Sequence, residues 1–155
     1  NDQIGIPQAL SLTTKTITFW TNIAGLKSYN VVYEDSANKY AGFSSGGGLN
    51  VGYANSAGTA NLIFGFNGVT SSSELGQWHF YAIVYDIGAS SAIVSLYKDG
   101  NLFNSVTKSD TVVANSLTSI GARNSGSNAF NGAIDDFRIF DRVLTQSEIQ
   151  GIYSS

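Results

Sequence analysis

A run of ten residues, QWHFYAIVYD at 77–86, limits what this chain can fold into. In an extended chain successive side chains point to opposite faces, and here both faces carry mostly apolar side chains. A strand with two apolar faces fits the middle of a sheet that is covered on each side. Further on, Asp99-Gly100 separates two more β-type runs, 92–98 and 102–106. Because aspartate and glycine tolerate positive φ angles, this pattern predicts a two-residue hairpin.

Short β-branched and aromatic runs recur along the rest of the chain between clusters of glycine, asparagine and serine. The chain has 17 glycines and one proline, which is typical of many short strands joined by turns. Near the end, Thr145 and Glu148 have the spacing of a helix capping box, and Ile149, Ile152 and Tyr153 then share one side of a helix. We therefore expect a short C-terminal helix packed against the sheets. The other predicted strands are 16–22, 49–53, 61–67, 116–122, 129–134 and 136–140.

Length and composition exclude several classes of function. A chain of 155 residues suits one domain with its own core and is short for two. Charged residues make up 12% of it and the net charge is −3, so we expect no nucleic acid binding and no attraction to anionic membranes. The chain has no cysteine, which excludes disulfides and thiolate metal sites. No apolar run approaches the roughly 20 residues of a spanning helix, so we expect no membrane insertion.

Six motifs follow one another in a distinctive order. They are WHF at 78–80, YD at 85–86, LYKDG at 96–100, IGA at 120–122, FNGAIDDFRIF at 130–140 and LTQSEI at 144–149. In this order they resemble the laminin-G-like (LamG-like) jelly rolls of the concanavalin A-like lectin/glucanase superfamily. The resemblance implies an all-β fold, a two-sheet antiparallel jelly-roll sandwich, here followed by the short C-terminal helix. It also implies a secreted or cell-surface protein that binds sugars, proteins or calcium, or that spaces other domains.

The resemblance covers nearly the whole chain, so residues 1–155 are interpreted as a single domain. In the family, a short turn containing an aspartate normally precedes the residues that match Asp2 to Pro7, and here that turn is truncated. The first residues also lack the charged and apolar regions of a signal peptide. We therefore expect a domain excised from a larger secreted or surface protein.

Catalysis has little support in the sequence. Some relatives on this sandwich are glycosidases, which need two carboxylates about 5 to 10 Å apart. Glutamate occurs only at positions 34, 74 and 148, and no predicted strand carries carboxylates at alternate positions. Glu34 and Asp35 are adjacent and are expected in a loop. His79 is the only histidine, and its apolar strand favours a packed or hydrogen-bonded role over a place in a triad.

Calcium is the metal that this chain could bind, because it accepts carboxylate and backbone oxygens. In the family, the aspartate that matches Asp135 often holds a structural calcium together with main-chain oxygens from the N-terminal region. Asp2 is the expected neighbour. The alternative is that Asp135 and Asp136 pair with nearby arginines or accept amide hydrogen bonds from loops.

Sugar recognition requires flat aromatic rings together with amides, hydroxyls or carboxylates. The predicted aromatic platform consists of Trp20, which shares a polar strand face, and of Tyr81 and Tyr85 beside His79. A sugar platform requires Trp20, Tyr81 and Tyr85 to be exposed together. The alternative is that these rings are buried, because most aromatic residues of a sandwich fill its core. Weaker platform candidates are Tyr40 and Tyr53, and the expected core residues are Trp78, Phe80, Phe64 and Phe137.

Loop residues offer a second way to bind a ligand, since sandwich domains often bind at one end through their connections. Arg123, Asn124, Asn128 and Asn131 cluster in one such region. We expect a non-catalytic module that binds an extracellular glycan or polysaccharide and carries a structural calcium. The alternatives are a protein-adhesion or spacer domain that contacts a surface protein and, third, a glycoside hydrolase or lyase of the same fold.

Overall fold

The structure, a computed structural model, describes residues 3–6, 11–55 and 61–155. In these residues two antiparallel sheets form a sandwich, here named sheet I and sheet II. Sheet I has the order β1 (Ile4–Gly5), β10 (Leu117–Ile120), β3 (Asn30–Asp35), β4 (Tyr40–Phe43), β5 (Leu49–Ala54) and β6 (Asn61–Phe66). Sheet II has the order β11 (Gly132–Phe140), β2 (Lys15–Ile23), β7 (Trp78–Ile87), β8 (Ala92–Lys98) and β9 (Asn101–Lys108).

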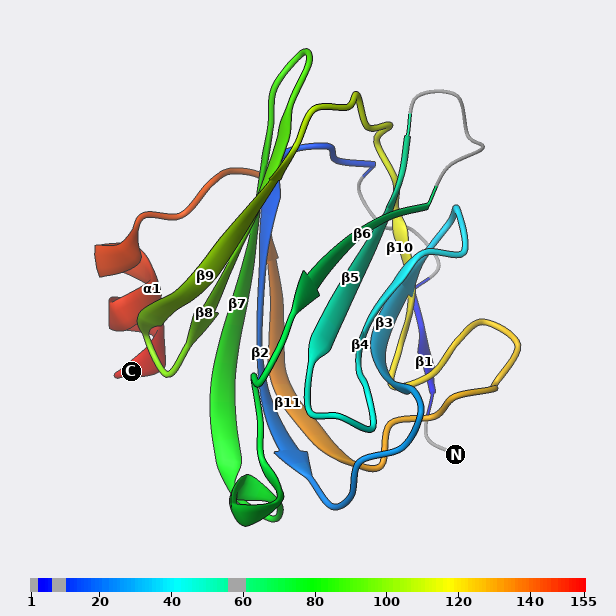
Figure 1. Cartoon of the computed structure of the whole chain (residues 1–155), viewed down its shortest axis with the longest axis vertical. Helices are drawn as coiled ribbons and strands as arrows, with labels where there is room; N and C mark the ends of the chain where they lie inside the picture. Colours follow the sequence, from blue (N-terminus) through cyan, green and yellow to red (C-terminus); the bar gives the residue numbers. More distant parts are fainter. Residues whose placement is uncertain (1–2, 7–10, 56–60) are drawn as a thin grey trace.

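Two short helices complete the fold (Figure 1). The 3₁₀ helix η1 (Ser72–Glu74) lies in the connection between β6 and β7, and α1 (Gln146–Tyr153) lies against the outer side of sheet II. The Thr145 hydroxyl accepts a hydrogen bond from the Glu148 amide, and the Glu148 carboxylate accepts one from the Thr145 amide. The predicted sandwich and C-terminal helix are therefore confirmed. Among the described residues, no helix has the length and apolar character needed to span a membrane.

The predicted central strand and hairpin are confirmed. β7 lies in the middle of sheet II, between β2 and β8. At the turn between β8 and β9, Asp99 and Gly100 have φ angles of 49° and 78°. Positive φ at both central residues is the conformation that favours a tight hairpin in a twisted sheet.

The last strand differs from its prediction. The sequence indicated two strands, at 129–134 and 136–140, whereas the structure has the single strand β11. Its register against β2 shifts between Asp135 and Arg138, and Asp136 has a φ angle of 46°. This bulge breaks the alternation of side chains within one continuous strand, which is why the pattern suggested two.

Two hydrophobic clusters explain why β7 is apolar on both faces. Its inner residues, such as Tyr81 and Ile83, are fully buried in the main core between the sheets. Its outer residues Phe80 and Ala82 are buried in a second cluster beneath the helix, together with Ile149. The chain thus needs α1 as a third layer over sheet II.

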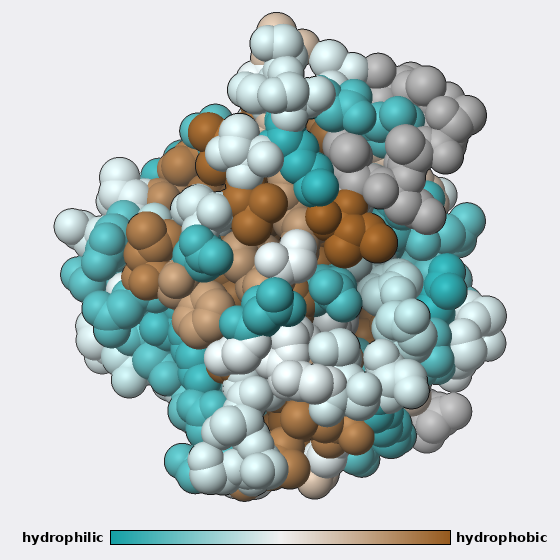
Figure 2. All heavy atoms as spheres, viewed as in Figure 1, coloured by the Kyte–Doolittle hydropathy of each residue, from teal (hydrophilic) through white to brown (hydrophobic). Residues whose placement is uncertain are grey.

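Figure 2 shows how polar and apolar side chains are distributed over one side of the molecule. Hydrophobic residues gather over β8, β9 and β6, where the edges of the two sheets face the viewer. The surface at the right, on the side of sheet I, is mostly hydrophilic.

One lysine lies inside the sandwich. The side chain of Lys15 donates hydrogen bonds to the Leu12 and Asn115 carbonyl oxygens, and its Nζ lies 5.1 and 5.3 Å from the ring centres of Tyr53 and Tyr85. Burial lowers the pKa of Lys15 to about 8, although the negative charge of Asp35 acts in the opposite direction. Folding therefore favours the neutral amine above that pH.

We predict that the free energy of unfolding rises by about 2 kcal/mol between pH 8 and pH 10. In this window the unfolded chain binds a proton at Lys15 that the folded chain has already lost. Burial raises the pKa of Tyr33 and Tyr85. Above about pH 10, the ordinary pKa of tyrosine, the unfolded chain loses these protons before the folded chain does, so the free energy of unfolding falls again. Urea unfolding at several pH values measures this slope. Lys15→Met should remove it, and a flat profile for the natural chain would contradict the prediction.

Candidate functional site

The predicted aromatic platform does not form. Tyr81 and Tyr85 are 0% and 1% exposed and lie between the two sheets. The Tyr81 ring packs on Phe19 and Phe43, with ring centres 5.8 and 5.3 Å apart, and the Tyr85 hydroxyl is hydrogen bonded to the Tyr33 hydroxyl. The prediction that these two rings could meet a ligand at the surface was wrong, because their face of β7 is the one that meets sheet I.

Trp20 points away from the core, as predicted, but it is covered by α1. Its ring stacks on Tyr153 at 5.7 Å and contacts Phe80 at 5.5 Å, so the indole is only partly exposed. Trp20 and Tyr81 therefore lie on opposite faces of sheet II and cannot contact one sugar ring.

Trp78 was expected in the core, yet it is 46% exposed. The reason lies in strand length. The last register pair between β7 and β8 is Tyr81 with Lys98, so β7 extends past the β8–β9 hairpin and Trp78 has a strand neighbour only on the β2 side, Asn22. The expected burial of Phe80 and Phe64 is confirmed, and Phe137 is partly buried against the core.

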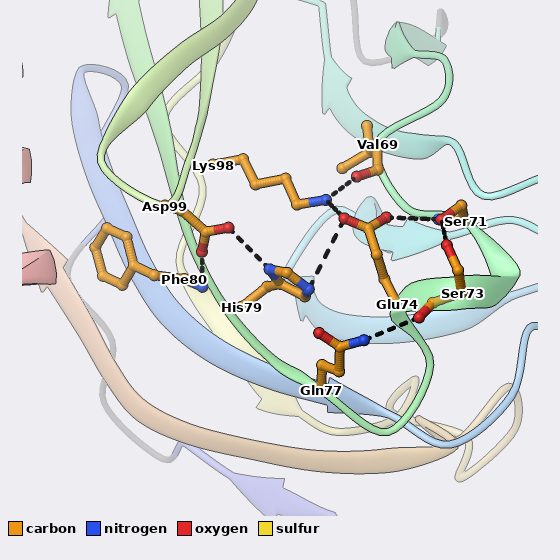
Figure 3. A network of polar contacts seen from close by, with 9 residues as sticks. All are labelled: Val69, Ser71, Ser73, Glu74, Gln77, His79, Phe80, Lys98 and Asp99. Atoms are coloured by element: carbon orange, nitrogen blue, oxygen red, sulfur yellow. Dashed lines mark hydrogen bonds and ion pairs between the residues drawn. The ribbon is translucent and has the colours of Figure 1, made fainter.

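His79 belongs to a polar network at one end of the sandwich (Figure 3). Its Nδ1 lies 2.8 Å from an Asp99 carboxylate oxygen and its Nε2 lies 3.8 Å from Glu74. The Lys98 amine donates to the same Glu74 oxygen and to the Val69 carbonyl. The hydrogen bond from Lys98 is the main reason that the pKa of Glu74 is lowered to about 2. His79 thus has the hydrogen-bonded role expected of it through Asp99, and Lys98 is the residue that joins the hairpin to the η1 segment.

The outer face of sheet I carries small residues in its middle. Ala41, Val51 and Phe64 face the core, so the residues that alternate with them face outward. The outward positions include Gly42, Gly52 and Gly65, with Asn50 between them. Asn50 pairs with Gly42 on one side and with Gly65 on the other. The backbone is open to close approach at the exposed Gly65, where a β-carbon would meet only the Asn50 side chain. The backbone of Asn30 and Val31 covers Gly42, and the Lys39 side chain lies over Gly52.

Next to these residues of sheet I, two tyrosines and an arginine from separate parts of the chain lie close together. Tyr29, which is 45% exposed, precedes β3, and Tyr40 begins β4. Their rings meet edge to face, with centres 5.9 Å apart. The guanidinium of Arg123 lies 5.3 Å from the centre of the Tyr40 ring. Burial raises the pKa of the Tyr40 hydroxyl, and the adjacent Tyr29 contributes to the rise.

Glu34 holds the loop that supplies Arg123 and Asn124. Its side chain is 2% exposed, and one carboxylate oxygen accepts a hydrogen bond from Arg123 Nε at 2.7 Å. The other oxygen accepts from the Asn124 amide at 2.6 Å, and the Asn124 side chain donates to the Thr118 hydroxyl. Glu34 was expected in a loop, but it lies in β3 and faces outward, where it fixes both residues over the sheet. We name this surface, made of Tyr29, Tyr40, Asn50, Arg123 and Asn124, the tyrosine face.

The tyrosine face unites some predicted site residues and leaves others out. It includes Arg123 and Asn124 from the predicted loop site and Tyr40 from the weaker aromatic candidates. Trp20, Tyr81 and His79 belong elsewhere. The sequence analysis missed Tyr29. Its position among polar residues and outside every predicted strand could have indicated an exposed ring.

A cavity of about 730 Å³ lies between the edge of sheet I and β11. Asp135 and Asp136 line it, together with Lys27 and Asn131. Asp136 forms an ion pair with Arg138 at 2.8 Å, and Asp135 accepts a hydrogen bond from the Asp136 amide. An ion pair with an arginine and a hydrogen bond from an amide are the contacts expected if these two aspartates do not bind calcium.

The described residues do not by themselves assemble a calcium site. No group of three or more histidine, aspartate or glutamate side chains lies close enough to hold a metal within them. Calcium takes six to eight oxygens, and Asp135 is the only member of the predicted pair in the described part of the chain. Asp2 lies outside the described residues.

The glutamates that a glycosidase mechanism would need are engaged in ion pairs. Glu34 pairs with Arg123, Glu74 with Lys98 and Glu148 with Arg142, each at 2.7 Å or less. The three side chains come from β3, η1 and α1, which occupy different sides of the sandwich. Among the described residues, this arrangement does not place two glutamates across one ligand.

Two antiparallel sheets with this strand order and an open outer face define a lectin-type jelly-roll sandwich. A family model described as the concanavalin A-like lectin/glucanases superfamily (Laminin_G_3) matches residues 1–150, and the chain belongs to this superfamily. No curated protein sequence matches the chain.

Several solved structures share the fold. The CBM40 module of the Ruminococcus gnavus IT-sialidase, solved with α2,3-sialyllactose, has a TM-score of 0.71 and 13% identity, over 99% of this chain and 97% of that chain. A heptameric pentraxin from Limulus polyphemus has a TM-score of 0.67 and 15% identity, over 97% and 75%. The NanB sialidase of Streptococcus pneumoniae has a TM-score of 0.73 and 14% identity, over 97% of this chain and 27% of the enzyme. At such identities the likeness concerns the fold.

Proposed function

We propose that this chain is a non-catalytic module that binds an extracellular glycan through the tyrosine face. The observation that carries the proposal is the meeting of the exposed Tyr29 ring, the Tyr40 ring and the Arg123 guanidinium on the outer face of sheet I, which also carries Asn50 and the exposed Gly65. Aromatic rings pack against the C–H faces of sugars, and amide and guanidinium groups hydrogen bond to hydroxyls. A ligand can approach the backbone closely at Gly65.

The ion pair with Glu34 indicates the charge of the ligand. Arg123 is the cation of the tyrosine face, and Glu34, with its side chain 2% exposed, already balances it. Because this carboxylate already balances the charge of the guanidinium, whose Nε it accepts from, we infer an uncharged glycan. Its binding should change little with ionic strength, since exposed charges are screened by salt and neutral contacts are not.

The resemblance to a module solved with a sugar supports glycan binding on this fold, and the proposed location is extracellular, in a secreted or surface protein. We propose as well that calcium stabilises the domain through Asp135 and Asp2. In that case the ion stabilises the N-terminal end of the fold and takes no part in contacts with the glycan.

A glycan array tests the function. The purified domain is applied at low and high salt, with calcium and with a chelator. We expect retention on neutral glycans and little change with salt. Thermal unfolding of the same samples tests the calcium proposal, and we expect a lower melting temperature in chelator. Retention on sialylated glycans alone would overturn the inferred ligand class. No retention under any condition would overturn glycan binding and favour a protein-adhesion or spacer role, and an unchanged melting temperature would overturn the calcium proposal.

A further inference from the structure

A second aromatic surface lies on the opposite side of the sandwich, on the outer face of sheet II below α1. Trp20 pairs with Phe80, and Asn22 pairs with Trp78, across β2 and β7. Trp20 and Trp78 are therefore diagonal neighbours on one face, roughly 7 Å apart at their β-carbons. Tyr153 at the end of α1 stacks on Trp20 and is itself 37% exposed. We name Trp20, Trp78, Tyr153 and Asn22 the Trp78 face.

The position of Trp78 keeps its ring open to solvent. β7 continues past the hairpin turn, so no strand covers Trp78 on that side. Gly100 at the turn contributes no side chain, and a β-carbon placed there would lie 3.1 Å from the Tyr153 ring. Trp78 is therefore exposed because the hairpin ends before it, and almost half of its surface is open to solvent.

Polar groups beside the rings complete the chemistry of the surface. The Asn22 side chain donates from Nδ2 to the Gly76 carbonyl at 2.9 Å, which fixes its amide and leaves the Oδ1 atom directed away from that bond. A fixed amide next to flat rings can accept a hydroxyl while the rings pack on C–H groups. The four residues that define the face are uncharged, and their aliphatic neighbour Ile152 is partly buried in the cluster beneath α1. This composition fits an uncharged sugar better than a protein surface or an anionic ligand.

We propose that the Trp78 face is a second glycan-contacting site, so that one domain can engage a polysaccharide on both sides of the sandwich. Its ligand class is an uncharged sugar that stacks on Trp78 and hydrogen bonds to Asn22. The tyrosine face lies on sheet I and the Trp78 face on sheet II, with the core between them. No single sugar unit can contact both, and two weak sites on one domain raise the avidity for a polymer.

The two tryptophans of the chain allow a direct test, because both belong to this face. The probes are soluble neutral polysaccharides, a β-glucan, a xylan and a galactomannan, used in affinity electrophoresis and in fluorescence titration. We expect a polysaccharide that retards the domain to change its tryptophan emission. Trp78→Ala should weaken the apparent affinity by roughly 3- to 10-fold, and Phe103→Ala, which removes another exposed ring, should not.

The two sites are separated by variants on opposite faces. In Tyr40→Ala the emission change should persist, and the double variant with Trp78→Ala should lose retardation. Unchanged emission in the natural domain together with a Trp78→Ala variant that migrates like it would overturn the second site. Loss of binding in Trp78→Ala with full binding in Tyr40→Ala would instead overturn the function proposed for the tyrosine face. Melting curves of each variant exclude unfolding as the cause.

Discussion

Tyr40→Ala is expected to weaken glycan binding at the tyrosine face by roughly 30-fold, or about 2 kcal/mol, the size of effect typical of a central contact residue. The substitution removes one of the two rings that meet edge to face. It also removes the surface over which Arg123 lies at 5.3 Å, so the guanidinium loses a contact that holds it in place. Isothermal titration with the glycan selected on the array measures the change.

Tyr40→Phe is the matched control for that loss. It keeps the ring and its contacts with Tyr29 and Arg123 while removing the hydroxyl, so we expect most of the affinity to remain. Equal losses in the two variants would assign the effect to the hydroxyl. Unchanged affinity in Tyr40→Ala would remove Tyr40 from the site.

Trp20→Ala is expected to lower the free energy of unfolding by about 3 kcal/mol, near the lower end for a buried tryptophan because the ring is partly exposed. Trp20 lies between Phe80 and Tyr153, with ring centres within 5.7 Å of each. Its removal leaves a cavity beneath α1 and loosens the packing of the C-terminal helix. Urea unfolding followed by circular dichroism measures the loss.

Trp20→Phe keeps part of the stack and should recover much of that stability. If Trp20→Ala instead kept the stability of the natural chain, the helix would not depend on this contact, and the packing role of Trp20 would be contradicted. This pair of variants also separates a structural effect of Trp20 from loss of the sugar platform that the sequence suggested.

Local patterns predicted most of the fold. The hairpin at Asp99-Gly100 and the capping box at Thr145 depend on residues close together in sequence, so their geometry follows from backbone and side-chain chemistry alone. The apolar run of β7 likewise predicted its central place. The bulge in β11 was missed because a one-residue shift looks like a break in the pattern.

The site depends on contacts that no local pattern contains. Both faces of β7 are apolar, so alternation could not decide whether Tyr81 or Phe80 would meet the other sheet. Trp20 is covered by Tyr153, and Arg123 is held by Glu34, which is 89 positions away in the chain. Those pairings follow from the order in which strands join the sheets.

Nuclear magnetic resonance can locate the residues of the domain that contact the glycan. Backbone amide signals are followed while the selected glycan is added to the isotope-labelled domain. If the tyrosine face binds the glycan, saturable shifts will cluster at its five residues, Tyr29, Tyr40, Asn50, Arg123 and Asn124. Saturable shifts elsewhere, with none at these five residues, would contradict it.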